Sequence, residues 1–143
     1  MRWPFAREGT THIGVAVATT TVAFLLDVPL LGWPALAATL FVLNFFRDPE
    51  RVGPADPALV LAPADGRVIK VDELHDDRFL HGPAKRVCIF MSPLDVHVNR
   101  IPADGTVVDV IYKEGSFLRA YADEASLENE QSAVVAERAD GTR

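Results

Sequence analysis

A long apolar region near the start of the chain constrains the fold more than any other feature. Between Ile13 and Phe46 the only charged residue is Asp27. Helix-interrupting residues follow that aspartate: Pro29, Gly32 and Pro34. Because proline and glycine break helices, the sequence predicts two apolar helices rather than one long helix. The first is expected at about residues 10–26 and the second at about residues 35–46.

Each apolar piece is shorter than the roughly 20 residues that usually cross a bilayer. A hairpin that dips into the membrane, or two short spans, is therefore expected. Arginines stand on both flanks, which favours the cytoplasmic side of the cell membrane for both ends: Arg2, Arg7, Arg47 and Arg51. A cleaved signal peptide, with small residues at 36–38, and a buried core hairpin are the alternatives, but a second apolar stretch argues against cleavage. Residues 1–51 are thus predicted to form a membrane anchor and connector.

The remaining residues, 52–143, carry the whole net charge of −6. An acidic domain is a poor nucleic-acid partner, because phosphate contacts need Lys and Arg. Short Val- and Ile-rich runs alternate with turn residues, and five of them are predicted as strands: residues 59–61, 68–71, 86–90, 107–112 and 133–136. Residues 118–130 fit either a helix or a loop. The expected fold is mainly β, with small antiparallel, barrel-sandwich-like units and an N-terminal hydrophobic α-helical hairpin.

The tetrapeptide Pro-Ala-Asp-Gly occurs twice, at residues 63–66 and 102–105. Proline presets one backbone angle of a turn, and glycine adopts the positive φ that such turns need. The repeat therefore predicts two β-turns, each followed by a strand. For Asp104 a plain turn role is sufficient.

His97 lies in a dense polar block that follows the predicted strand at 86–90. Imidazole can exchange a proton near neutral pH. Asp95, His97 and Asn99 would share one face of an extended segment, because side chains alternate there. From the residues alone, a structural and a catalytic role for His97 remain equally open. His75 and His81 lie in an acidic stretch without metal-ligand spacing, where a solvated loop is the favoured interpretation and no metal site is predicted.

Four blocks occur in an order that resembles short-type phosphatidylserine decarboxylases: residues 45–51, 63–66, 91–100 and 128–130. The resemblance implies a proenzyme that cuts itself at a Gly-Ser bond. The serine becomes a pyruvoyl group on a small α chain, where it reacts with the substrate amine and accepts the electrons released with CO₂. The product is phosphatidylethanolamine. The resemblance therefore implies a carboxy-lyase of phospholipid biosynthesis.

The resemblance also implies roles for individual residues. Asp65 matches the family aspartate associated with self-cleavage, and His97 matches the histidine expected to donate a proton in decarboxylation. A second family histidine, assigned to processing, is replaced by Arg100, which cannot act as a neutral base. Either His97 serves both steps or processing works differently. Gly115-Ser116 lies in the wrong block, so the pyruvoyl serine is expected beyond residue 143 and this β-chain part is expected to be inactive alone.

The expected partners are a phospholipid substrate, the membrane and the small pyruvoyl-bearing chain of the same proenzyme. Assembly into a homo-oligomer is left open. Residues 52–143 are predicted to form a β-rich decarboxylase domain that is incomplete at its C-terminal end. The alternative is a membrane-anchored, non-catalytic β domain that binds lipid headgroups or another partner. A downstream Phe-Gly-Ser would discriminate between the two.

Overall fold

The computed structural model describes residues 3–54, 56, 58–116 and 129–142. The chain forms two compact units, and each is described by itself. The first contains Met1–Pro54, Pro63–Gly66 and Met91–Arg100, and the second contains Ala55–Ala62, Arg67–Phe90 and Ile101–Arg143. The choice between helix and loop at residues 118–130 falls almost entirely outside the described residues.

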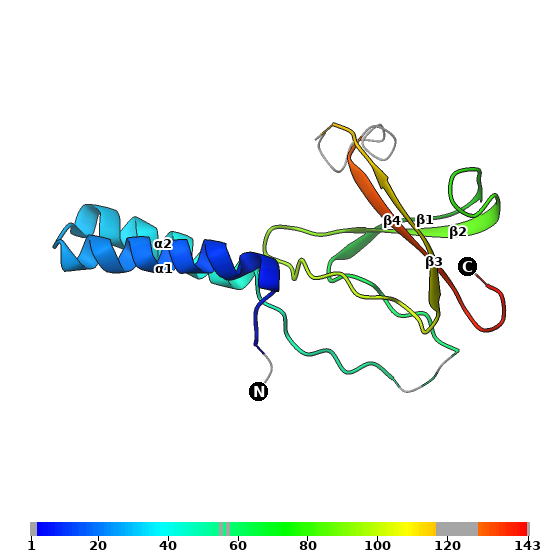
Figure 1. The fold of residues 1–143 in the computed structure, drawn as a ribbon, viewed down its shortest axis with the longest axis horizontal. Helices are drawn as coiled ribbons and strands as arrows, with labels where there is room; N and C mark the ends of the chain where they lie inside the picture. Colours follow the sequence, from blue (N-terminus) through cyan, green and yellow to red (C-terminus); the bar gives the residue numbers. More distant parts are fainter. Residues whose placement is uncertain (1–2, 55, 57, 117–128, 143) are drawn as a thin grey trace. The chain divides into compact units, whose positions relative to one another are not determined.

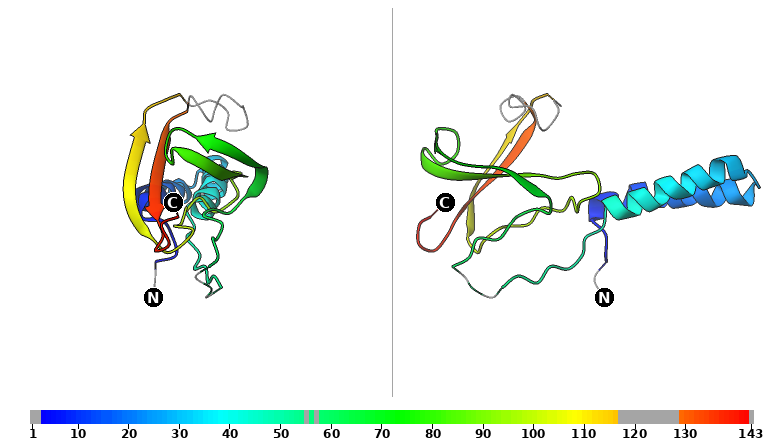
Figure 2. Two further views of the ribbon diagram at one scale, coloured as in Figure 1. Left: turned by 90° about the vertical axis from the view of Figure 1, so that its right-hand side faces the viewer. Right: turned by 180° about the vertical axis from the view of Figure 1, so that it is seen from behind.

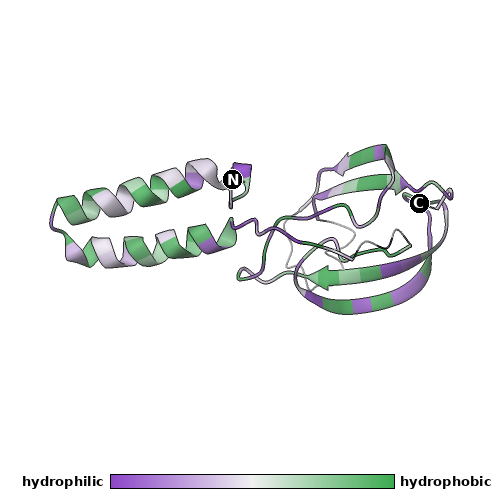
Figure 3. Cartoon of the chain, turned by 90° about the horizontal axis from the view of Figure 1, so that it is seen from below, coloured by the Kyte–Doolittle hydropathy of each residue, from purple (hydrophilic) through white to green (hydrophobic). Residues whose placement is uncertain are grey.

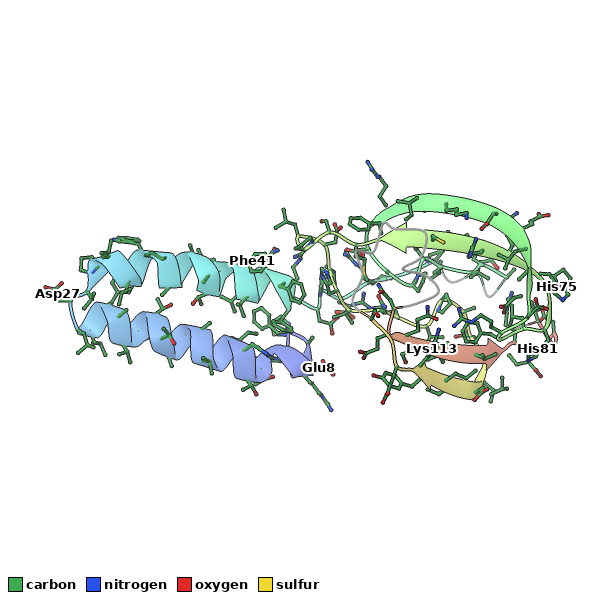
Figure 4. The ribbon with its side chains drawn as sticks, turned by 90° about the horizontal axis from the view of Figure 1, so that it is seen from above. Glu8, Asp27, Phe41, His75, His81 and Lys113 are labelled. Carbon is green, nitrogen blue, oxygen red and sulfur yellow. The ribbon has the colours of Figure 1, made fainter. Side chains whose placement is uncertain are left out.

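Two antiparallel helices dominate the first unit (Figure 1). A short 3-10 turn, η1 (Arg7–Gly9), leads into α1 (Thr10–Leu25), and α2 (Pro29–Phe45) returns beside it. Figure 4 labels Asp27 in the turn between the helices and Glu8 at the other end of the hairpin. Asp27 adopts a positive φ of 54°, which reverses the chain within three residues.

The two predicted helices are confirmed, but the predicted start of the second at residue 35 is wrong. α2 begins at Pro29, because proline fits the first turn of a helix, where its missing N–H has no helical partner anyway. The N–H of Gly32 donates to the Val28 carbonyl at 2.9 Å. Pro34 lies inside the helix and removes one further hydrogen bond, which the surrounding helix tolerates.

Small and polar residues form the contact between α1 and α2. The hydroxyls of Thr20 and Thr39 are 2.8 Å apart and buried. A side chain on Gly32 would come within 2.9 Å of the Phe24 ring, so glycine permits the close approach. Large apolar side chains are instead exposed, among them Val15, Leu25, Leu30, Leu31 and Trp33. Figure 3 shows that hydrophobic residues occur along both helices. Within the described part of the chain, neither helix combines the length and apolarity needed to cross a membrane.

Two antiparallel pairs of strands form the second unit (Figures 1 and 2). β1 (Arg67–Asp76) pairs with β2 (Gly82–Phe90), and β3 (Thr106–Lys113) pairs with β4 (Gln131–Glu137). The fold class is therefore confirmed as mainly β with an N-terminal helical hairpin. Among the described strands these pairs are two separate sheets rather than a closed barrel.

Four of the five predicted strands lie within β1 to β4, and the prediction of a strand at residues 59–61 is wrong. Residues 59–61 form no strand, because the Leu61 N–H makes a single bond to the Pro102 carbonyl and Pro63 follows. β1 also continues to Asp76, through residues expected to form a loop. Asp72 and Arg86 are direct cross-strand partners and form two hydrogen bonds of 2.9 and 2.5 Å, which stabilise this extension.

Both Pro-Ala-Asp-Gly repeats bend the chain and lead into a strand, as predicted. Gly66 has a φ of 140°, so its positive φ is confirmed. Gly105 is not among the residues with positive φ, and the prediction for this glycine is wrong. A Cβ at Gly105 would lie 2.7 Å from the Glu137 carbonyl oxygen, so close backbone approach, not backbone angle, favours glycine there.

Candidate functional site

Three segments of the first unit meet at the base of the helical hairpin. They are the end of α2 with its connector, the turn at Pro63–Gly66 and the segment Met91–Arg100. Arg47 links two of them, because its guanidinium group donates to the Asn44 carbonyl at 2.6 Å and to the Leu94 carbonyl at 2.8 Å. The backbone N–H of Arg100 donates to the Pro63 carbonyl at 2.8 Å, which joins the turn at Pro63–Gly66 to the segment Met91–Arg100.

His97 is held on two sides. Its Nδ1 lies 3.0 Å from the Asp95 carbonyl oxygen, which can only accept, so this hydrogen bond places a proton on Nδ1 and leaves Nε2 for chemistry. The Phe45 ring stacks on the imidazole, with centroids 4.2 Å apart and an interplanar angle of 27°. The neighbouring Val96 is 1% exposed and anchors the backbone of this segment. The half-buried imidazole is therefore fixed in orientation.

The Asp95 carboxylate supports the turn before His97 instead of entering the site. It accepts a 2.7 Å hydrogen bond from the Ser92 N–H, and this bond is the main cause that lowers the pKa of Asp95. The predicted common face of Asp95, His97 and Asn99 is therefore only partly correct. His97 and Asn99 line one cavity, whereas the Asp95 side chain turns back toward Ser92.

Arg100, at the position of the second family histidine, has a structural set of contacts. Its guanidinium group donates to the Asp48 carboxylate at 2.5 Å and to the Pro49 carbonyl at 2.9 Å. The Asp48 side chain is only 11% exposed, so the ion pair is well shielded. These contacts connect the segment that carries His97 to the connector after α2.

Asp65 pairs with the Arg51 guanidinium group at the surface of the same unit. Within the described residues, no hydrogen bond joins Asp65 to His97. The structure thus places the two predicted catalytic residues in one unit without a hydrogen bond between them, and their catalytic roles stay predictions.

A cavity of about 710 Å³ lies beside His97. Its walls combine aromatic rings with polar and charged side chains. The rings are those of Trp3, Phe5, Phe45 and Phe46, and the polar and charged residues are Arg7, Glu8, Asp48, His97 and Asn99. Phe45 belongs to the first resemblance block, yet nothing in the sequence indicated its stacking on His97. The sequence indicates Arg7 only as a charge flanking the anchor, because no local pattern marks it as part of a site.

The remaining sequence candidates lie elsewhere. Figure 4 labels His75 and His81 at one end of the β1–β2 pair, where His75 Nε2 lies 3.3 Å from an Asp77 oxygen. No group of three or more potential metal-ligating side chains occurs in the described ranges. The Ser116 carbonyl accepts the Glu130 N–H at 3.0 Å, which makes this serine part of backbone pairing.

Comparison with known proteins identifies the family of this chain. Residues 38–143 match the family model of phosphatidylserine decarboxylase. The chain belongs to the phosphatidylserine decarboxylase family.

The similar relatives carry the name phosphatidylserine decarboxylase proenzyme. The protein of Syntrophotalea carbinolica is 43% identical over 98% of this chain and 65% of its own length. The protein of Ralstonia nicotianae is 43% identical over 95% of this chain and 63% of its own length. The protein of Salinibacter ruber is 49% identical over 76% of this chain and 49% of its own length. The chain thus spans less than two thirds of the length of these relatives. No solved structure matches it.

Proposed function

We propose that this chain is the larger, β-chain part of a phosphatidylserine decarboxylase proenzyme. The mature enzyme would convert phosphatidylserine into phosphatidylethanolamine and release CO₂. The observation that carries the proposal is the family match over residues 38–143, and the environment of His97 supports it. Two blocks of the family resemblance, 45–51 and 91–100, line a cavity that contains an oriented imidazole, and the block at 63–66 belongs to the same unit.

The imidazole of His97 is suited to the proton transfer that this reaction requires. Loss of CO₂ breaks a carbon–carbon bond and leaves the electron pair at the carbon that carried the carboxylate. A proton must reach that carbon before the amine product leaves. With Nδ1 donating to the Asp95 carbonyl, Nε2 of the protonated ring can supply this proton, and solvent can restore it afterwards.

The same nitrogen could serve self-cleavage. In the neutral ring Nε2 has a free lone pair and can accept a proton from a serine hydroxyl. Arg100 cannot share this task, because it is always charged and is occupied by Asp48 and Pro49. We therefore assign His97 to both processing and decarboxylation.

The residues around His97 fit a pyruvoyl group supplied by the small chain, from a serine expected beyond residue 143. The cavity of about 710 Å³ has room for a headgroup and a small carbonyl compound. His97 and Asn99, from the segment Met91–Arg100, are among the polar side chains that would border this group. When bound, the group supplies an electron sink for decarboxylation.

The helical hairpin is proposed to hold the enzyme at the cytoplasmic side of the cell membrane. Its contact surface contains small and polar residues, while large apolar side chains face outward. This pattern is opposite to that of a soluble helical pair and is typical of helices packed within lipid. Because each helix is short, we expect the hairpin to enter one leaflet rather than to span the bilayer.

The full-length proenzyme provides the test of this function. We expect the purified, self-cleaved protein to produce phosphatidylethanolamine and CO₂ from phosphatidylserine in detergent micelles. Residues 1–143 alone should be inactive, and mass spectrometry should find no pyruvoyl terminus at Ser116. A cleaved enzyme that binds phosphatidylserine without turnover would contradict the proposal and favour a headgroup-binding domain.

Asp65 is proposed to assist self-cleavage, and its pairing with Arg51 allows this role to be separated from a structural one. Asp65→Ala should leave an uncleaved chain on a gel. Arg51→Gln removes the partner but keeps the carboxylate, so cleavage should continue if Asp65 acts on the reacting groups. Equal loss of cleavage in both variants would mean that the ion pair only stabilises the turn.

A further inference from the structure

The cavity beside His97 contains a cation that the proposed chemistry does not use. Arg7 belongs to η1, immediately before α1, and its exposed side chain lines the cavity of about 710 Å³. Among the described residues that line this cavity, Arg7 is the only lysine or arginine. Two carboxylates, Glu8 and Asp48, also line it, and that of Asp48 is paired with Arg100. Nothing in the described part of the chain forms an ion pair or hydrogen bond with its guanidinium group.

The other arginines of this unit that the structure describes, Arg47, Arg51 and Arg100, are occupied. Arg47 binds two backbone carbonyls, Arg51 pairs with Asp65, and Arg100 pairs with Asp48. These three hold segments of the unit together and are poorly available to a ligand. Arg7 alone of this group presents an unpaired guanidinium group to a cavity that also contains the proposed proton donor.

The position of Arg7 along the hairpin matches the level of lipid phosphates. Arg7 lies where the apolar helices begin. Phe5 precedes it by two residues, and the ring of Trp3 packs edge-on against the ring of Phe5, with centroids 5.7 Å apart. Tryptophan and arginine at the end of an apolar segment are typical of the membrane–water interface. If the hairpin is inserted as proposed, the guanidinium group lies among the headgroups.

We propose that Arg7 binds the phosphodiester group of the phospholipid substrate and so positions the headgroup beside His97. This inference rests on the proposed function. A guanidinium group matches two phosphate oxygens with two parallel hydrogen bonds. The aromatic walls formed by Phe5, Phe45 and Phe46 would contact the apolar part of the lipid next to the phosphate.

The substrate carboxylate is the other anion that Arg7 could bind, but the chemistry disfavours it. The carboxylate loses its charge as CO₂ forms. An arginine paired with it would stabilise the ground state more than the transition state and would slow the reaction. The phosphodiester keeps its charge throughout, so binding it holds the substrate without opposing the bond cleavage.

The test compares Arg7→Gln and Arg7→Lys in the processed full-length enzyme, with phosphatidylserine at low mole fraction in neutral mixed micelles. Arg7→Gln should raise KM about tenfold, as expected for loss of a charge-assisted contact, and should leave kcat within about twofold. Arg7→Lys should recover part of the loss. Arg67→Gln removes a charge from an exposed arginine that does not line the cavity and should leave both constants unchanged.

A second measurement identifies the group that Arg7 binds. Phosphatidylethanolamine keeps the phosphodiester but lacks the carboxylate, so Arg7→Gln should weaken its direct binding in the same micelles by a factor similar to the rise in KM. An unchanged KM, a lower kcat at unchanged KM, or unchanged binding of phosphatidylethanolamine would overturn the inference. Binding of phosphatidylethanolamine needs no turnover, so it tests the role of Arg7 independently of catalysis. If the wild-type enzyme produces no phosphatidylethanolamine from phosphatidylserine, that result refutes only the proposed function.

Discussion

At the scale of single residues, His97 is the side chain whose surroundings fit chemistry best. The Asp95 carbonyl sets the tautomer and the Phe45 ring sets the plane of the imidazole. We expect His97→Ala in the full-length proenzyme to slow self-cleavage and, in the fraction that is cleaved, to lower decarboxylation per pyruvoyl group by about 10²–10⁴-fold, the usual contribution of a positioned general acid. Cleavage on a gel and product formation should be measured separately, because the two proposed roles predict loss of both.

The control for His97→Ala is Phe45→Leu, which keeps an apolar wall but removes the stacked ring. It should cleave and should retain part of the activity, because the hydrogen bond from Nδ1 to Asp95 remains. Complete cleavage and wild-type turnover in His97→Ala would remove this residue from the mechanism.

The sequence predicted the identity of the site residues better than their contacts. The polar block around His97 was recognisable, because its residues are close in the chain. The stacking of Phe45, the ion pair of Arg100 with Asp48 and the position of Arg7 join residues from separate parts of the sequence. Such contacts depend on how segments pack, and neither composition nor periodicity carries that information.

At the scale of elements, the contact between α1 and α2 depends on the buried pair of threonine hydroxyls. Thr39→Val should lower the free energy of unfolding in micelles by about 1 kcal/mol, because the Thr20 hydroxyl is left without its partner in a buried contact. The double variant Thr20→Val with Thr39→Val should be closer to wild type, since no orphaned hydroxyl remains. Additive losses in the double variant would show that the hydroxyls do not interact.

The β1–β2 connection should respond to acid through Asp76. Its carboxylate accepts backbone N–H bonds from Leu80, Arg78 and Phe79, and the bond from Leu80 contributes most to lowering the pKa of Asp76. A depressed folded-state pKa stabilises the folded state above the unfolded value of about 4, and this stabilisation is lost as pH falls through the folded-state pKa.

Asp76→Ala should therefore be less stable than wild type at neutral pH, and the difference should narrow below about pH 4. Thermal unfolding from pH 7 to pH 3 provides the measurement. Asp77→Ala, which changes the adjacent exposed carboxylate, is the matched control. A constant difference between Asp76→Ala and wild type across this range would contradict the assignment.

Regular elements were predictable where local pattern and packing agree. The Val- and Ile-rich runs in β1 to β4 have direct strand partners, whereas residues 59–61 have the same local pattern without a ladder. The predicted start of α2 is wrong, because Pro29 can begin a helix as readily as it can end one. The extension of β1 depends on the cross-strand pair of Asp72 and Arg86, which becomes visible only when the register is known.

At the scale of the whole molecule, membrane attachment and catalysis are proposed to share the first unit. A deletion of residues 1–46 would remove the hairpin but also Phe45 and Arg7, so loss of activity would not separate the two roles. Substitutions near the tip of the hairpin can separate them. Leu30, Leu31 and Trp33 are 84%, 63% and 65% exposed and do not line the cavity at the base.

We expect the triple variant of Leu30, Leu31 and Trp33 to Gln to bind phosphatidylcholine vesicles at least about a hundredfold more weakly than wild type, because burial of each such side chain contributes about 1.5–3 kcal/mol. Val52→Gln, at a residue that is 92% exposed outside the hairpin, should bind like wild type. In detergent micelles, where substrate is delivered without a bilayer, the triple variant should self-cleave and turn over normally. Vesicle binding that survives a salt wash in the triple variant would place the anchor elsewhere, and loss of micellar turnover would mean that the tip of the hairpin also supports the site.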